Sequence, residues 1–172
     1  MNVLKVLQEI QISQAEGLTN IELEKIAKKI LGKNFLGVYP CDAFPKINRN
    51  KTNNFSIIFN LSKHNEGGSH FVSILKIEEN LFYFDSFGKK CDNKFVMIFL
   101  KSISDTYFFN GFEIQHPSSM FCGVYSLGFL ISSQKFNIPI ESFLNLFYFK
   151  NVINDQIIID FIVKVLKVNK NK

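Results

Sequence analysis

Residues 117–134 read PSSMFCGVYSLGFLISSQ, and this stretch decides which fold class the sequence predicts. A polar segment with a proline leads to Cys122, and from there the chain is apolar with interspersed small residues to about Gln134. Pro and Ser before an apolar run are typical of a helix start, and an apolar run without a polar face is typical of a buried helix. We therefore predict a buried helix that begins at Cys122.

Apolar, β-prone runs come before this helix and predict strands, at 55–60, 70–77 and 81–87. The polar break at 78–80 predicts a hairpin between the last two. A further strand is predicted over 107–115, with an interruption near Asn110-Gly111. The stretch 37–54 contains two prolines and is interpreted as turns.

The clearest of the other predicted helices covers 20–31. Its apolar residues share one face: Leu23, Ile26, Ala27 and Ile30. Thr19 and Glu22 form a capping box at its start, and Gly32 provides the stop. Further helical patterns occur at 3–11, 93–102, 140–149 and 154–167. Because helices precede and follow a group of strands, without regular βαβ repetition, the predicted class is α+β.

Composition favours one globular domain over residues 1–172, because 47% of the residues are hydrophobic and only 20% are charged. The net charge of +5 favours acidic partners such as nucleic acid, although a mildly basic protein without such a partner has the same balance. We expect non-specific DNA binding at most.

The sequence does not have the pattern of a signal peptide, so we expect a protein that is not secreted. The N-terminus carries Lys5 and Glu9 in place of an apolar signal-peptide core, and the longest apolar run, 95–100, is too short for a bilayer. The three cysteines form neither a disulfide framework nor a zinc pattern, which indicates a reducing compartment and no metal. We expect a monomer that needs no cofactor and binds no membrane.

Cys122 is a candidate nucleophile, because the positive end of a helix favours a thiolate. His70 opens one predicted strand and Asp85 ends the next, so a hairpin would place the carboxylate beside the imidazole that it could orient. Gln115 precedes the loop to Cys122, where its amide would suit an oxyanion. Each residue alone has a structural explanation: a buried Cys, a core His, a turn Asp or a polar strand end. His64 and His116 are rival bases without a placed acid partner.

Three blocks resemble adenain, the maturation protease of adenoviruses, and its relatives in virophages and Polinton-type elements. They are FLGVY at 35–39 followed by Phe44-Pro45, then GGSHF at 67–71 with YFDSFG at 83–88, and QHPSSMFCG at 115–123. The order His, acid, Gln, Cys agrees with that family over about residues 35–131. Phe71 stands where the family usually has Trp, and Asp85 where adenain has Glu; the related SUMO-processing proteases have Asp.

The resemblance implies a viral thiol protease with His70 as general base, Asp85 as its orienting acid, Cys122 as nucleophile and Gln115 in the oxyanion hole. It implies a mixed central sheet packed between helices, with the catalytic helix in the core and a papain-like arrangement of the site. It also implies cleavage of capsid or core precursors near small residues such as Gly, in the virion or at the assembly site of an infected cell, with stimulation by DNA as an open expectation.

Other functions fit parts of the sequence. A SUMO- or ubiquitin-like-protein protease has the same residue order, but its Gln and Cys usually lie closer than here, where 116–121 intervene. An acetyltransferase on the same scaffold and a non-enzymatic virion protein that binds nucleic acid are further alternatives. Adenain is activated by a peptide that is disulfide-linked to a Cys between its acid and Gln blocks. Residues 93–114 contain no Cys, and Cys91 lies too near Gly88, so we expect activity without such a peptide.

Overall fold

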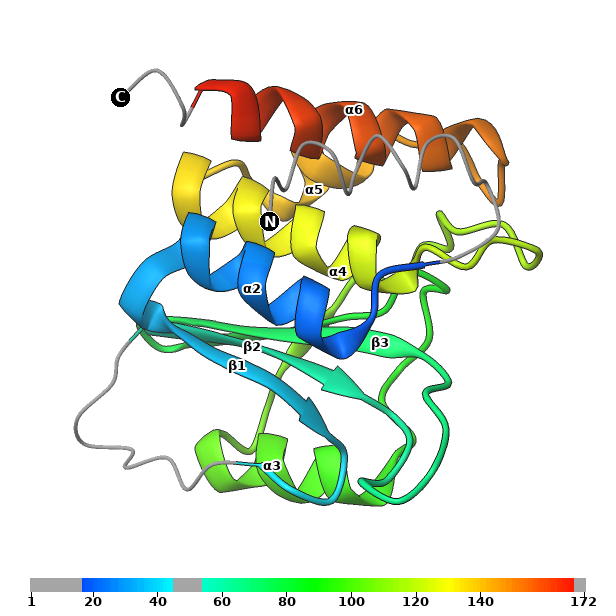
Figure 1. Ribbon diagram of the computed structural model, residues 1–172. Helices are drawn as coiled ribbons and strands as arrows, with labels where there is room; N and C mark the ends of the chain where they lie inside the picture. Colours follow the sequence, from blue (N-terminus) through cyan, green and yellow to red (C-terminus); the bar gives the residue numbers. More distant parts are fainter. Residues whose placement is uncertain (1–16, 45–53, 169–172) are drawn as a thin grey trace.

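The computed structural model describes residues 17–44 and 54–168, so the helix predicted over 3–11 lies outside the described residues. A five-stranded sheet lies between helices on its two faces (Figure 1). The strands lie in chain order: β1 Phe35–Pro40, β2 Asn54–Asn60, β3 Phe71–Ile77, β4 Asn80–Phe84 and β5 Phe108–Phe109. The pairs β1–β2 and β4–β5 are parallel, and β2–β3 and β3–β4 are antiparallel. The predicted α+β class, with a mixed central sheet between helices, is confirmed.

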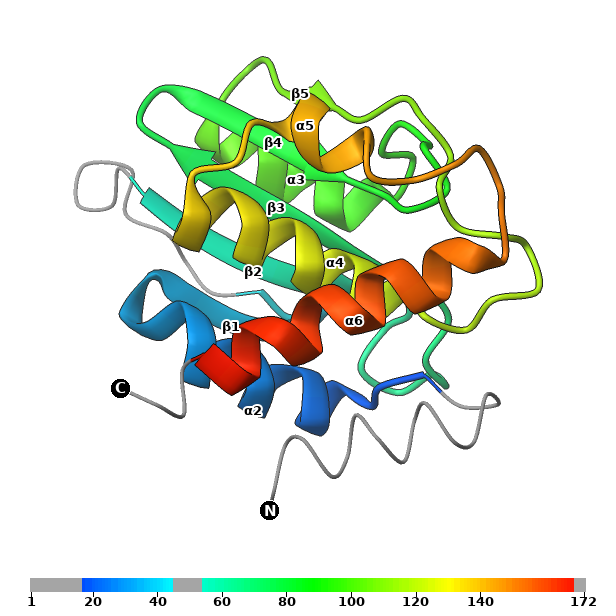
Figure 2. The same ribbon diagram turned by 90° about the horizontal axis from the view of Figure 1, so that it is seen from above.

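Helices cover the two faces unequally (Figure 2). Those on one face are α2 Asn20–Leu31, α4 Cys122–Leu130, α5 Ile140–Leu144 and α6 Ile153–Val168. Of the helices within 17–44 and 54–168, only α3, Lys94–Ile103, lies on the other face. No helix within 17–44 or 54–168 has the length and apolar character needed to cross a bilayer.

Helix α2 has the boundaries and the buried face that its sequence predicts. The Thr19 hydroxyl accepts a hydrogen bond from the Glu22 N–H, and the Glu22 carboxylate accepts one from the Thr19 N–H, which completes the capping box. Its four predicted face residues are all buried: Leu23, Ile26, Ala27 and Ile30. The helix ends at Gly32, whose positive φ of 69° is unfavourable for other residues.

The sheet separates two apolar clusters. Alternate side chains of β2, namely Phe55, Ile57 and Phe59, pack toward α3, whereas Ile58 joins the cluster around α4. Because both faces of the sheet are covered, these strands contain apolar residues at almost every position. This is the physical reason why the alternation of polar and apolar residues in the strand sequences is weak.

Helix α4 lies at the centre of the larger cluster, and every residue from Cys122 to Leu130 is buried. The helix contacts β3, α2 and α6, and it continues as a π-helical turn over Ile131–Lys135. A Cβ at Gly128 would overlap the Ile158 side chain, so glycine permits the close approach of α6. The buried helix that the sequence predicts from Cys122 is confirmed.

The sequence does not predict strand β1, because the two prolines of the stretch 37–54 favour turns. The strand pairs in parallel with β2, and its register shifts between Phe35 and Val38. A short run has no partner that can be recognised from sequence alone, and only the folded sheet provides its hydrogen bonds. Pro40 is compatible with this strand because β1 lies at an edge of the sheet.

The strand predicted over 107–115 is reduced to the two residues of β5. Asn110 ends the ladder, because its side chain takes up both backbone groups of Asp85 on the neighbouring chain segment. Its Oδ1 accepts from the Asp85 N–H at 3.0 Å, and its Nδ2 donates to the Asp85 carbonyl at 2.7 Å. Gly111 then turns the chain away with a φ of 56°.

Other predicted boundaries differ less. The strand predicted over 81–87 ends at Phe84, because Asp85 starts a turn in which the Gly88 N–H donates to the Asp85 carbonyl at 2.8 Å. The helix predicted over 140–149 ends at Leu144 and is followed by turns. The helices predicted over 93–102 and 154–167 agree with α3 and α6 to within one residue at each end.

Phe99 should contribute strongly to stability, since it packs edge-on against Phe44, Phe55 and Phe59 and is 1% exposed. We expect Phe99→Ala to lower the free energy of unfolding in urea by about 3–5 kcal/mol, because it leaves a cavity in the cluster under α3. Ile98→Ala on the same helix is the control, because Ile98 is 58% exposed and should change stability little. Equal losses for both variants would contradict the assigned core.

Candidate active site

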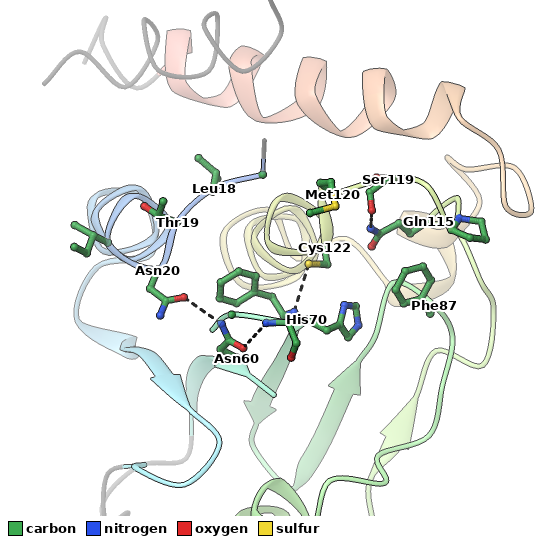
Figure 3. A pocket seen from close by; sticks show the side chains of 16 residues that line it. Leu18, Thr19, Asn20, Asn60, His70, Phe87, Gln115, Ser119, Met120 and Cys122 are labelled. Atoms are coloured by element: carbon green, nitrogen blue, oxygen red, sulfur yellow. Dashed lines mark hydrogen bonds between the residues drawn. The ribbon is translucent and has the colours of Figure 1, made fainter. Parts of the chain in front are cut away.

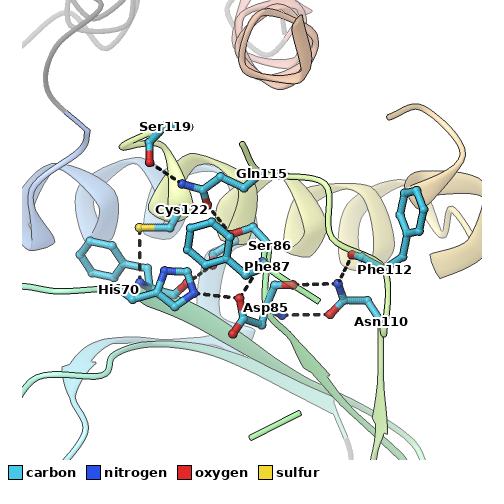
Figure 4. Close-up of polar contacts among 11 residues, drawn as sticks. His70, Asp85, Ser86, Phe87, Asn110, Phe112, Gln115, Ser119 and Cys122 are labelled. Atoms are coloured by element: carbon cyan, nitrogen blue, oxygen red, sulfur yellow. Dashed lines mark hydrogen bonds and ion pairs between the residues drawn. The ribbon is translucent and has the colours of Figure 1, made fainter. Parts of the chain in front are cut away.

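Three of the four candidate residues line one cleft, and Asp85 lies behind His70 (Figures 3 and 4). His70 directly precedes β3 and Asp85 directly follows β4. Because these strands are antiparallel neighbours, the start of one lies beside the end of the other. Cys122 is the first residue of α4, and Gln115 lies in the segment that leads from β5 to α4. The hairpin and the buried helix therefore bring together residues that are distant in sequence.

The thiol of Cys122 lies at the N-terminus of α4, and the residue is 9% exposed. Its Sγ accepts a hydrogen bond from the Phe71 N–H at 3.4 Å. Phe121, at the N-cap position, makes no side-chain capping bond. The N–H groups of a first helical turn have no intrahelical acceptor and carry a partial positive charge. This end of α4 therefore places partial positive charge beside the sulfur and leaves the Cys122 N–H for a bound group.

The imidazole of His70 lies between the Cys122 thiol and the Asp85 carboxylate (Figure 4). Its Nε2 is 2.8 Å from Asp85 Oδ1, which leaves Nδ1 for the thiol. The ring stacks on Phe87 at a centroid distance of 4.9 Å. Burial alone would lower the pKa of His70, but the hydrogen bonds and charges of Asp85 and Cys122 raise this pKa to about 9. The imidazole is therefore protonated at neutral pH when it faces a thiolate.

Asp85 is held rigidly. Its side chain is 3% exposed, and Oδ1 accepts from the Phe87 N–H at 2.8 Å as well as facing His70. Asn110 binds both backbone groups of Asp85, as described for the end of β5. Asn110 is a site residue that sequence reasoning missed, because Asn-Gly signals only a turn. Its contact with Asp85 depends on the parallel pairing of β5 with β4.

The side chain of Gln115 is oriented by two serines that sequence reasoning also missed. The Ser86 hydroxyl donates to Gln115 Oε1 at 2.5 Å, and Gln115 Nε2 donates to the Ser119 carbonyl at 2.8 Å (Figure 4). A carbonyl can only accept, so this contact fixes which end of the amide is the nitrogen. The Ser86 carbonyl also accepts from the N–H groups of Ile114 and Gln115. The second Nε2–H of Gln115 remains for a group bound in the cleft.

The cleft has a volume of about 680 Å³, and the start of α2 forms the wall across from Gln115 and Phe87 (Figure 3). Leu18, Thr19 and Asn20 contribute to this wall. Asn60 supports the floor, because its Oδ1 accepts from the N–H groups of Ser62 and Ser69 and so shapes the loop before His70. Nothing in the sequence around the wall residues or Asn60 predicts that they line the cleft.

The rival histidines do not line this cleft. His64 has an acid partner that the sequence did not reveal, since its Nδ1 is 2.8 Å from Asp42 Oδ2, but the pair is on the surface. His116 Nδ1 pairs with the hydroxyl of Ser118 inside a turn. Among the described residues, no group of His, Cys, Asp and Glu side chains is arranged to hold a metal ion.

The described chain combines an α+β fold, built on a five-stranded mixed sheet, with a cysteine at the start of a buried helix. Among solved structures, the chain is similar to the ASFV pS273R protease, with a TM-score of 0.59 and 18% sequence identity over 88% of this chain and 68% of that chain. At this identity the similarity shows the fold alone. No protein-family model and no curated protein sequence matches the chain.

The pKa of His70 can be measured directly from its ring signals in an NMR titration. The folded value of about 9 lies above the usual 6.5, so the imidazolium persists at neutral pH and is lost as the pH rises through about 9. We expect Asp85→Asn to move this midpoint to lower pH, because it removes a charge that stabilises the imidazolium. Asp42→Asn, in the surface pair with His64, should leave it unchanged. A midpoint that does not respond to Asp85→Asn would contradict the assigned pairing.

Proposed function

We propose that this protein is a cysteine endopeptidase of the viral maturation type. The observation that carries the proposal is the grouping of Cys122, at the uncapped start of a buried helix, with the His70–Asp85 pair and the oriented amide of Gln115. A thiolate, a protonated imidazole and donors for an oxyanion are what acyl transfer through a thioester requires. The similarity in fold to a viral protease, the ASFV pS273R protease, supports the same reading.

In the proposed reaction, the Cys122 thiolate attacks the carbonyl carbon of the scissile peptide bond. The developing oxyanion accepts hydrogen bonds from the Cys122 N–H and from the Nε2–H of Gln115. His70 then donates its Nδ1 proton to the leaving amine, and a thioester with the N-terminal part of the substrate remains. Asp85 keeps the imidazole oriented throughout and does not itself take the proton.

The thioester is hydrolysed by a water molecule. Neutral His70 removes a proton from that water, and the hydroxide attacks the thioester carbon within the same oxyanion site. Collapse of the intermediate releases the carboxylic acid product, which loses its proton to solvent, and restores the thiolate facing the imidazolium. The two half-reactions use His70 first as an acid and then as a base.

We propose that the substrates are capsid or core precursor proteins of a virus, cleaved beside small residues such as Gly, in the virion or at the site of assembly. Low exposure of Cys122 supports the preference for Gly, because a substrate backbone can approach a recessed sulfur most closely where it carries little side chain. The resemblance of the three sequence blocks to the adenain family supports the viral role. The positive net charge is compatible with stimulation by DNA.

Cys122→Ala should abolish cleavage of a panel of Gly-containing peptides, with a loss of roughly 10⁴-fold or more, because the nucleophile is removed. The fold should persist, since the change only removes a sulfur atom at a helix end. Cleavage is followed by mass spectrometry, with ubiquitin-like C-terminal peptides in the same panel to separate the maturation role from that of a ubiquitin-like-protein protease.

Cys91→Ala is the matched control for this test, because it removes a second thiol that is outside the cleft. It should retain cleavage close to that of the unaltered protein. Loss of cleavage in Cys91→Ala together with full cleavage in Cys122→Ala would mean that the nucleophile is wrongly assigned.

We further propose that activity needs no peptide attached through a disulfide. Cys91 is 7% exposed, and burial is the main cause that raises the pKa of its thiol to about 11. A thiol that stays protonated is a poor partner for disulfide exchange. The purified protein should therefore cleave the panel in a reducing buffer, without added peptide. The same assay with added DNA measures stimulation, and strict dependence on an oxidised peptide linked to Cys91 would overturn the proposal.

A further inference from the structure

The two donors of the proposed oxyanion site are held by a turn that has its own support outside the cleft. Ser119 is the centre of this turn. Its carbonyl accepts from Gln115 Nε2 at 2.8 Å, and its hydroxyl accepts from the Phe121 N–H at 3.2 Å. Phe121 immediately precedes Cys122, so Ser119 contacts both the Gln115 side chain and the chain segment that leads to Cys122. Whatever fixes Ser119 also fixes the Gln115 amide and the approach to the Cys122 N–H.

Asp155, in the first turn of α6, provides that support. The Ser119 hydroxyl donates to Asp155 Oδ1 at 2.8 Å. A serine hydroxyl has one proton, so donation to a carboxylate leaves its lone pairs for the Phe121 N–H. The contact therefore sets the direction of both hydrogen bonds of the Ser119 side chain. A hydrogen bond to a charged acceptor is also stronger than one between neutral groups.

The position of the Asp155 carboxylate is fixed in turn from within α4. The Tyr125 hydroxyl donates to the same Oδ1 at 2.8 Å, and Tyr125 is fully buried on the helix that begins with Cys122. Burial and the Asp155 charge raise the pKa of Tyr125 far above its usual range, so this hydroxyl keeps its proton and donates. Asp155 thus joins the turn before Cys122 to the body of the helix that carries Cys122.

Asn154, the residue before Asp155, binds the chain segment that carries Gln115. Asn154 is fully buried, and its Nδ2 donates to the Ile114 carbonyl at 2.7 Å, next to Gln115. Two consecutive residues at the start of α6 therefore bind the two chain segments that carry the oxyanion donors. Neither Asn154 nor Asp155 lines the cleft, so no contact with a substrate explains these hydrogen bonds.

We propose that Asp155 is a positioning residue for the oxyanion site, acting through Ser119 on the amide of Gln115 and on the start of α4. The inference rests on the proposed cysteine endopeptidase function for its kinetic consequence. Its structural consequence, a fixed orientation of the Gln115 side chain, is independent of any activity.

The kinetic test compares Asp155→Ala, Ser119→Ala and the double variant. We expect each single variant to lower kcat by about 10–100-fold, less than the 10²–10³-fold expected when an oxyanion donor itself is removed, with KM little changed. The double variant should lose less than the product of the two single losses, because both single variants remove the Ser119–Asp155 hydrogen bond. Asp155→Asn keeps an acceptor oxygen and should recover most of the activity. Asp160→Ala is the control, because Asp160 is exposed on the same helix.

Two further readouts separate positioning from loss of fold. The rate of Cys122 alkylation by iodoacetamide should be unchanged in Asp155→Ala, because the thiol and His70 are untouched. The side-chain amide signal of Gln115 in a ¹⁵N NMR spectrum, assigned with Gln115→Ala, should shift in Asp155→Ala and in Ser119→Ala but not in Asp160→Ala. If Asp155→Ala does not fold, Ser119→Ala carries the test, because it removes the same contact from the other side.

The outcomes are distinct. Unchanged kcat in Asp155→Ala and Ser119→Ala, or an unchanged Gln115 amide signal, would overturn the positioning role. A fall in kcat matched by an equal fall in alkylation rate would also overturn it, because the damage would then be general. If the unaltered protein cleaves no peptide, the proposed function fails, and the Gln115 amide signal still decides the role of Asp155.

Discussion

Helix α4 is buried along its whole length between the sheet and the helices α2 and α6, and the location of the candidate nucleophile follows from that burial. A helix without a polar face cannot slide or rotate toward solvent without exposing apolar surface, at a cost of roughly 25 cal/mol per Å². Its N-terminus reaches the candidate cleft, and Cys122 is the residue there. The packing of the apolar core thus directs the N-terminus of α4, with its free N–H groups, toward the cleft.

The opposite wall of the site depends on the pairing of β3 with β4. The start of β3 and the end of β4 lie beside the N-terminus of α4, so the hairpin places His70 and Asp85 near the thiol. Placing three ionisable groups in a largely buried location is costly unless they are paired. Here the carboxylate, the imidazole and the sulfur form a row, and the raised pKa of His70 is the measurable result of that pairing. The hydrogen bonds of Asn110 and Phe87 with Asp85 hold this residue in position beside His70.

Support for the oxyanion donors comes from still farther along the chain. Helix α6 packs on α4 through the space left at Gly128, and this packing carries Asn154 and Asp155 to the turn around Ser119. The same helix therefore closes the core and holds the site. A change in the packing of α6 would reach Gln115 through two hydrogen bonds, although Asp155 itself does not line the cleft.

The sequence by itself determined the features that depend on local patterns. The apolar run from Cys122 predicted a buried helix, the capping box at Thr19 predicted the start of α2, and the helix–strand–helix order predicted the α+β class; all three are confirmed. Those signals can be read locally because capping and burial periodicity involve residues a few positions apart. The order of the blocks around His70 and Cys122 also singled out the candidate residues.

The tertiary structure alone decided what depends on contacts between distant segments. Strand β1 exists because β2 supplies its partner, and the strand after residue 107 stops early because Asn110 binds Asp85 instead of extending the ladder. The sequence likewise does not predict that Ser86, Ser119 and Asp155 support Gln115. A serine or aspartate has the same local signature on a surface turn as beside a buried amide. Its partner is set by how the sheet, α4 and α6 pack together, and no local spacing encodes that packing.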